Sequence, residues 1–65
     1  MIRTVTIETE ESQIEFTGEY NNGEDGDVRS FETYKAIYKD MDIKAVLIEL
    51  GSLWDFEEQI LNKII

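Results

Sequence analysis

The chain has 65 residues, and we expect residues 1–65 to form a single small domain. It contains no Cys and no His, which excludes disulfides and metal sites built from thiolate or imidazole ligands. Fifteen Asp and Glu against six Lys and Arg give a formal net charge of −9, which argues against nucleic acid or an anionic membrane as a partner and favours a basic protein surface.

Two stretches near the N-terminus alternate between apolar and polar residues with period two. Residues 2–9 and 13–20 are also rich in β-branched side chains, so we predict two strands paired as a hairpin. The apolar positions that share one face are Val5, Ile7, Ile14, Phe16 and Tyr20. Gly18 interrupts the second strand and is a candidate for a bulge.

Residues 21–32, "NNGEDGDVRSFE", fit part of an EF-hand calcium loop. Asp25, Gly26 and Glu32 fall at loop positions 5, 6 and 12. A strand precedes this segment where an EF-hand has a helix, and positions 1 and 3 are Asn21 and Gly23, which lack carboxylates. We therefore predict a long hairpin turn and no metal or other cofactor.

The segment "RSFETYKAIYKD", residues 29–40, permits two structures. A strand would place Phe31, Thr33, Lys35 and Ile37 opposite Glu32, Tyr34, Ala36 and Tyr38. A helix would instead gather the aromatic residues on one stripe, with Ser30 as its cap. The aromatic residues and Thr33 favour a third strand, and the helix stays open as the alternative.

The period changes to that of a helix after Asp40. Residues 40–51 predict a short helix capped by Asp42 or Asp40 and ended by Gly51. Its apolar residues are Ile43, Val46, Leu47 and Leu50. Residues 52–65 predict a second helix, whose apolar stripe consists of Phe56, Ile60, Leu61 and Ile64. The predicted fold is α+β: a three-stranded antiparallel meander followed by two short C-terminal helices packed on one face.

The residue types for common catalytic sites are missing. Without His or Cys, most pairs of nucleophile and base are unavailable, and no glycine-rich phosphate loop occurs. Paired carboxylates would need a cleft that so small a domain seldom forms. We therefore expect no enzyme activity. The N-terminus lacks the pattern of a secretory signal and no apolar run is long enough to span a membrane, so we expect a cytoplasmic protein.

The carboxylates recur at short intervals along the chain. Three pairs are two residues apart: Glu8 with Glu10, Asp25 with Asp27, and Asp40 with Asp42. In extended chain this separation is about 6.5–7 Å, similar to the spacing of successive phosphates on a nucleic-acid strand. A folded surface with such an array can occupy a site built for DNA. The alternative is that Glu and Thr simply fill the solvent-facing strand positions.

The order of features over residues 13–65 resembles a family. An acidic turn ("NNGEDGD"), a Tyr-rich strand ("ETYKAIYK"), a short helix ending in Gly ("DIKAVLIELG") and a final helix ("DFEEQILNKII") follow one another. This arrangement is similar to that of the very small acidic phage inhibitors of uracil-DNA glycosylase. The resemblance implies a homodimer that mimics DNA. Its carboxylates fill the basic groove of the enzyme, and an apolar pocket takes up the side chain that the enzyme wedges into DNA.

The resemblance, together with the residue types, gives two sets of candidate binding residues. The phosphate-like surface is predicted to contain Glu24, Asp25, Asp27, Glu32, Asp40 and Asp42. The apolar pocket or dimer contact is predicted to contain Tyr34, Tyr38, Met41 and Trp54. The alternatives are ordinary sheet packing for the two tyrosines and a place in the core for Trp54. The acidic surface is expected to lie away from Lys35, Lys39 and Lys44.

The expected partner is a basic DNA-binding protein. A glycosylase comes first, and a restriction enzyme, a CRISPR nuclease or a sliding clamp are further candidates. The alternative function is a small acidic interaction or regulatory module, such as an antitoxin or an assembly factor, in which the charge is incidental.

Overall fold

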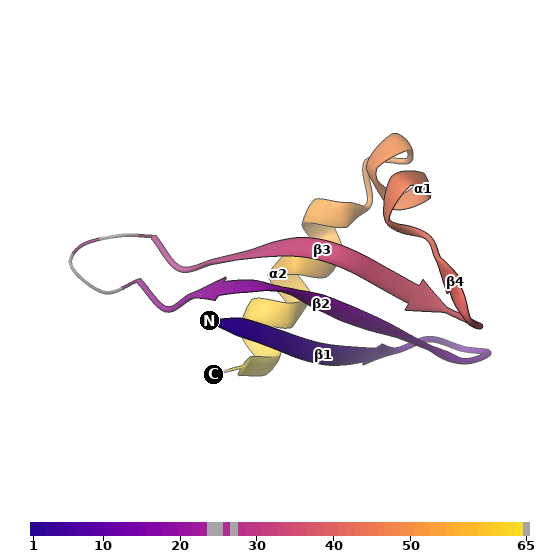
Figure 1. The fold of residues 1–65 in the computed structure, drawn as a ribbon, viewed down its shortest axis with the longest axis horizontal. Coiled ribbons are helices and arrows are strands. Elements are labelled where there is room, and N and C mark those ends of the chain that lie inside the picture. Colours follow the sequence, from indigo (N-terminus) through magenta and orange to yellow (C-terminus); the bar gives the residue numbers. More distant parts are fainter. Residues whose placement is uncertain (24–25, 27, 65) are drawn as a thin grey trace.

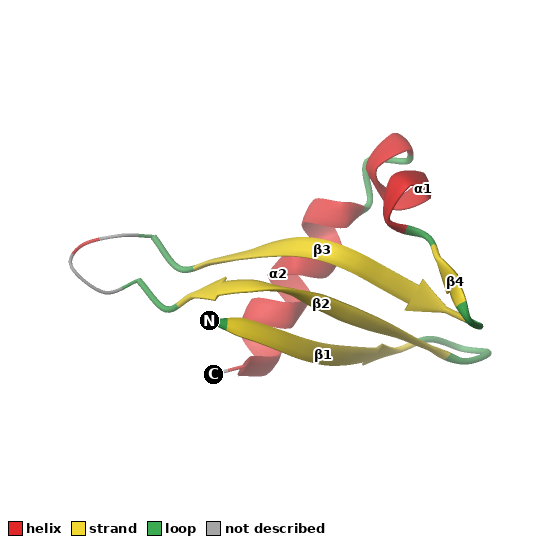
Figure 2. Ribbon diagram, in the orientation of Figure 1, coloured by secondary structure: helices red, strands yellow, loops and turns green. Residues whose placement is uncertain are grey.

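The computed structural model describes residues 1–23, 26 and 28–64. It is an α+β fold in which an antiparallel sheet is followed by two C-terminal helices, as predicted (Figure 1). The elements are β1 (Ile2–Glu8), β2 (Gln13–Asn21), β3 (Ser30–Tyr38), β4 (Met41–Asp42), α1 (Lys44–Glu49) and α2 (Leu53–Ile64). The strands pair in sequence order, so that β1 and β4 are the two edges of the sheet (Figure 2).

The described sheet has four strands where three were predicted. The additional strand, β4, has only two residues, which is too short to give an alternating pattern in the sequence. It pairs with β3 through a two-residue turn in which Lys39 and Asp40 have φ values of 49° and 66°. These left-handed angles are typical of tight hairpin turns. Residues 30–38 are a strand, so the helical alternative for this segment is wrong.

A bulge in β3 changes which of its side chains face the helices. Thr17 pairs with Lys35 but the next residue, Gly18, pairs with Thr33, so Tyr34 is an extra residue in β3. The alternation of β3 therefore reverses after Tyr34. The side chains on the helix-covered side are Phe31, Thr33, Ala36 and Tyr38. The predicted side of the sheet was correct for Phe31 and Thr33, before the bulge. It was wrong for the residues after the bulge, from Lys35 on.

Gly18 is the residue that lets β2 lie close to β3 at this bulge. A Cβ atom at position 18 would lie 2.1 Å from the carbonyl oxygen of Glu32 and 2.9 Å from a ring carbon of Phe31. Any other residue would have to push the strands apart. Gly18 therefore lies at a bulge, as predicted, but the extra residue is Tyr34 of β3 and not a residue of the second strand.

The core lies between the sheet and α2, which crosses behind the strands in Figure 1. Phe16 and Ile60 are fully buried, and the Phe56 ring packs 5.3 Å from that of Phe16. The buried core residues are Ile7, Ile14, Phe16, Phe31, Ala36, Leu47 and Ile60. Phe56, Leu61 and Ile64 pack partly buried around them. The predicted apolar stripe of the second helix therefore does cover the sheet.

Polar contacts hold α2 on the sheet as well. The Glu57 carboxylate accepts hydrogen bonds from the Thr33 backbone N–H at 3.1 Å and from the Thr33 hydroxyl at 2.8 Å. Thr33 is buried and adjoins the bulge, so this carboxylate satisfies polar groups that water does not reach. Near the end of α2, the Lys63 ammonium donates a hydrogen bond to the Thr6 carbonyl on the edge strand β1.

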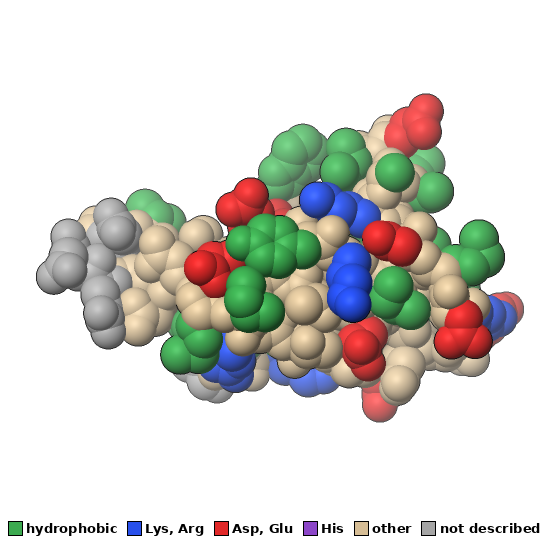
Figure 3. All heavy atoms as spheres, viewed as in Figure 1, with side chains coloured by type: hydrophobic (Ala, Val, Ile, Leu, Met, Phe, Trp, Pro, Cys, Tyr) green, Lys and Arg blue, Asp and Glu red, His purple; other side chains and the backbone are tan. Residues whose placement is uncertain are grey.

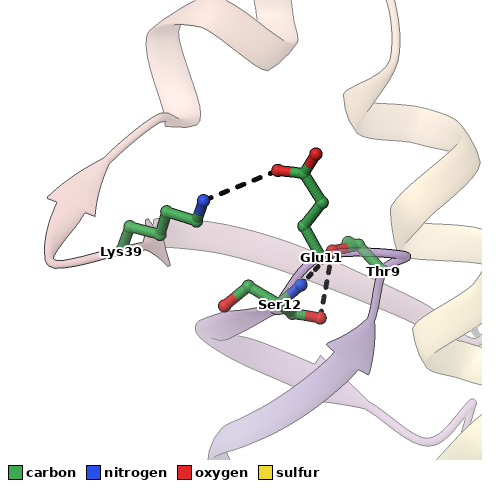
Figure 4. A network of polar contacts seen from close by, with 4 residues as sticks. All are labelled: Thr9, Glu11, Ser12 and Lys39. Atoms are coloured by element: carbon green, nitrogen blue, oxygen red, sulfur yellow. Dashed lines mark hydrogen bonds and ion pairs between the residues drawn. The ribbon is translucent and has the colours of Figure 1, made fainter.

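The turn between β1 and β2 is closed by its own side chains (Figure 4). The Thr9 hydroxyl donates to the Ser12 carbonyl at 3.0 Å and accepts from the Ser12 N–H at 3.1 Å. An ion pair at 3.6 Å between Lys39 and Glu11 connects this turn with the β3–β4 turn. Both partners are exposed, so the pair adds little stability.

The ends of α1 are fixed by specific hydrogen bonds. The Asp42 Oδ1 atom accepts from the backbone N–H of Lys44 at 3.0 Å and from that of Ala36 at 3.3 Å. Asp42 therefore serves the first turn of the helix, although the N-cap position itself is taken by Ile43. At the other end Gly51 has φ 71° and is the predicted stop.

Two further bonds complete this C-terminal cap. The Gly51 N–H donates to the Ile48 carbonyl at 3.0 Å and the Ser52 N–H to the Leu47 carbonyl at 2.9 Å, which is the Schellman pattern. Within the described residues, neither helix has the length and apolar character needed to cross a membrane.

Candidate functional site

The structure leaves two surfaces uncovered that differ in chemistry. The first, which we call the open face, is the side of the sheet turned away from α2. Strand alternation and register assign its side chains, which are Ile2, Thr4, Thr6, Glu8, Gln13, Glu15, Thr17, Glu19, Glu32, Tyr34, Lys35 and Ile37. It carries four carboxylates and one ammonium group. Figure 3 looks onto this side and shows acidic, basic and hydrophobic side chains interspersed.

Two carboxylates of the open face are cross-strand neighbours. Glu19 on β2 pairs directly with Glu32 on β3. Like charges in directly opposite positions destabilise a sheet. The Met1 ammonium lies 2.8 Å from Glu19 Oε2, and no ion pair within the described part of the chain involves Glu32. The register therefore places two like charges opposite each other, and the Met1 ammonium offsets part of their repulsion at Glu19.

Lys35 lies in the row next to this pair, opposite Thr17. Beyond it, Glu15 on β2 lies opposite Thr6 and Ile37, so the open face is anionic on both sides of a single cation. We predicted that the acidic surface would lie away from Lys35, but this lysine lies within it. The side chains of the face carry a formal charge of −3, and the Met1 ammonium beside Glu19 reduces it to −2.

The predicted acidic residues are only partly brought together. Glu32 lies on the open face, and Glu24, Asp25 and Asp27 lie outside the described residues. Asp40 belongs to the tight β3–β4 turn, so it does not form an extended pair with Asp42. The Asp42 carboxylate is engaged at the start of α1, where the N–H groups of Lys44 and Ala36 hold its pKa below the ordinary value.

Three acidic residues of the open face were not among the predicted site residues. They are Glu8, Glu15 and Glu19, each on the polar side of its strand. Their alternation with Val5, Ile7, Ile14 and Phe16 is readable in the sequence. Their position beside Glu32 is not, because it depends on the register between β2 and β3.

The four predicted apolar residues lie in different places. Tyr34 is half-exposed at the bulge, whereas Tyr38 packs partly buried against the core with the Lys39 ammonium 5.4 Å above its ring. Sheet packing is thus the correct description of Tyr38. Met41 is exposed and Trp54 is 71% exposed, so a place in the core for Trp54 is wrong.

These four residues are absent from the lining of three depressions on the described surface. None of these three includes Tyr34, Tyr38, Met41 or Trp54. One of the three lies between the end of β1 and the end of α2, at Glu8, Gln59 and Lys63. The described residues also include no group of three acidic side chains that could hold a metal ion.

The second uncovered surface is apolar. We call it the α1 patch and define it by the exposed residues Met41, Val46, Leu50 and Trp54. Ile48 is also exposed but lies about 200° around α1 from Val46, on the other side of the helix. Together these are five of the nine large hydrophobic residues that are exposed in the described chain, within a span of fourteen positions. In Figure 3, hydrophobic side chains lie along the upper side of the molecule, where Figure 1 shows α1.

The α1 patch arises because only one side of a short helix reaches the core. Of the predicted apolar residues of this helix, Leu47 is buried and Ile43 is partly buried, whereas Val46 and Leu50 are exposed. The Leu50 N–H donates to the Val46 carbonyl at 3.0 Å, so these two residues lie one turn apart along the helix. Trp54 follows in the first turn of α2.

We compared the chain with protein-family models, with curated proteins and with solved structures. No family model, no curated protein and no solved structure matches it.

Proposed function

We propose that this chain is a non-enzymatic binding module whose open face docks on a positively charged surface of another protein. In the specific form of this proposal it is a DNA mimic. Its carboxylates occupy the groove of a DNA-binding enzyme, and uracil-DNA glycosylase is the first candidate. A restriction enzyme, a CRISPR nuclease or a sliding clamp offers the same kind of basic surface. The homodimer expected from the sequence stays a prediction.

The observation that carries the proposal is the direct pairing of Glu19 with Glu32. Such a pair lowers the stability of the isolated sheet, and a small domain has little stability to spare. A cationic partner would remove the repulsion between the two carboxylates, and this relief would add to the free energy of binding. Residues that destabilise the free protein in this way are typical of binding sites.

The test is an activity assay of purified uracil-DNA glycosylase with increasing amounts of the chain. We expect inhibition that weakens as salt is raised, because screening acts on exposed charges. The double variant Glu19→Gln/Glu32→Gln should inhibit at least tenfold less well, and it should be no less stable than the original chain. The matched control is Glu10→Gln/Glu58→Gln, which removes the same charge from exposed positions off the open face.

An observation also favours the alternative, an acidic interaction module whose charge is incidental. Lys35 interrupts the open face, and exposed carboxylates such as Glu10, Glu49 and Asp55 lie on other parts of the molecule. Under this alternative the chain would leave the glycosylase fully active. If inhibition occurs and the two double variants lose it equally, net charge alone is responsible and the open face is not the binding surface.

A further inference from the structure

The α1 patch is exposed although the helix that carries it is firmly held. Asp42 bonds the first turn, and the bonds of Gly51 and Ser52 close the last turn. Val46 and Leu50 are therefore exposed on a helix whose two ends are both held by hydrogen bonds. Apolar side chains that gather in this way on a small protein mark an interaction surface.

The charges around the α1 patch restrict what can cover it. Residues 40–58 contain Lys44 as the only cation, and their exposed acidic residues are Asp40, Asp42, Glu49, Asp55 and Glu58. Glu57 is turned to the sheet, where it accepts hydrogen bonds from the buried Thr33. One positive and five exposed negative charges give this segment a formal charge of −4 at its surface. A second copy of the chain would bring the same negative charge to the contact, and the two copies would repel each other. Charge complementarity instead requires a cationic partner.

The shape of the α1 patch restricts the partner further. Val46 and Leu50 form a short apolar row along α1, and Trp54 extends the exposed surface into α2. α1 stands out beyond the β3 side of the sheet in Figure 1, so a neighbour can approach it from outside. Rows of apolar side chains on a convex helix pack against the apolar stripe of another helix.

We propose that the α1 patch binds an amphipathic helix of another protein, in which Lys or Arg residues flank an apolar stripe. The apolar stripe packs on Val46, Leu50 and Trp54, and the flanking cations meet Glu49 and Asp55. This contact is separate from the open face and goes beyond the function proposed above.

The probe is a synthetic 14-residue peptide of Leu and Lys arranged with helical spacing. Trp54 is the only tryptophan and is 71% exposed, so its emission reports on burial of the α1 patch. We expect saturable binding with a shift of the emission to shorter wavelength. A peptide of the same composition in scrambled order, and a Leu/Glu peptide with the same helical spacing, should leave the emission unchanged.

Leu50→Gln is the decisive variant, because Leu50 is 71% exposed and its replacement leaves the core intact. It should weaken binding of the Leu/Lys peptide at least tenfold, which corresponds to about 1.4 kcal/mol. Val28→Gln is the matched control, since Val28 is also an exposed apolar residue but belongs neither to the α1 patch nor to the open face. This control should bind the peptide as the original chain does.

Two results would overturn the proposal. Equal binding of the helical and scrambled Leu/Lys peptides, or equal weakening by Leu50→Gln and Val28→Gln, would reduce the contact to unspecific charge attraction. Sedimentation of the chain alone that reveals a dimer with a shielded Trp54, abolished by Leu50→Gln, would make a second copy the occupant. The variant Glu19→Gln/Glu32→Gln changes only the open face, so it should bind the Leu/Lys peptide as the original chain does. This proposal and the function proposed above can therefore fail independently.

Discussion

The two helices follow each other along the chain and differ in what their apolar residues do. α2 has twelve residues and buries its stripe on the sheet, with Ile60 fully inaccessible. α1 has six residues and buries only Leu47. Hydrophobic periodicity is present in both, so it predicts that a helix has an apolar side but does not predict what covers that side. The apolar side of α2 is covered by the protein's own core. Much of the apolar side of α1 faces solvent.

Substitutions of one apolar residue in each helix test this comparison most strongly. Ile60→Ala should lower the free energy of unfolding by about 2–5 kcal/mol, because it opens a cavity beneath α2. Leu50→Ala should change it by less than about 0.5 kcal/mol, because the side chain is already in water. Urea denaturation of both variants measures the two values. Similar losses in the free energy of unfolding for the two variants would contradict the exposure of Leu50.

The polar attachment of α2 gives a smaller effect. Glu57→Ala should cost about 1–3 kcal/mol, since it leaves the buried Thr33 N–H and hydroxyl without an acceptor. Glu57→Gln keeps an oxygen acceptor and should cost less. Glu58→Ala, at an exposed neighbouring position, should have almost no effect. Thermal denaturation of the three variants checks the order, and a loss for Glu58→Ala equal to that for Glu57→Ala would contradict it.

The hydrogen bonds of Asp42 at the start of α1 give the smallest expected effect on stability, and this effect depends on pH. Hydrogen bonds from Lys44 and Ala36 lower the pKa of Asp42 in the folded protein. The stability that Asp42 contributes is therefore fully present above its unfolded pKa of about 3.9 and is lost as the pH falls through that value toward the folded pKa. The difference in Tm between the original chain and Asp42→Asn should shrink as the pH falls from 6 to 3. A constant difference would show that the carboxylate charge is not involved.

Much of the fold could be predicted because local patterns determine it. The alternation in β1 and β2, the stop at Gly51 and the stripe of α2 are all visible in the sequence. β4 was missed because two residues cannot show a period. The phase of β3 was wrong after Tyr34, because Gly18 marks the position of the bulge but nothing in the sequence shows that the extra residue belongs to the neighbouring strand.

The candidate site was harder to predict because it depends on contacts between strands. Glu19 and Glu32 are thirteen residues apart, and only the register of β2 with β3 makes them neighbours. For Trp54 a signal was available. It lies about 200° around the helix from Phe56, on the side away from the core stripe, given about 100° per residue. Helical geometry alone would have assigned it to the surface.

The outer strand β1 has a neighbour on one side only, and backbone groups on its free side offer hydrogen bonds to any passing extended chain. The ammonium of Lys63, reaching from α2 to the Thr6 carbonyl, places a charged blocker on that free side. Natural proteins often use lysine in this way to stop sheets from growing into one another. Lys63, near the end of the last helix, thus hinders the pairing of β1 with strands of other molecules. This opposes edge-to-edge aggregation at high protein concentration.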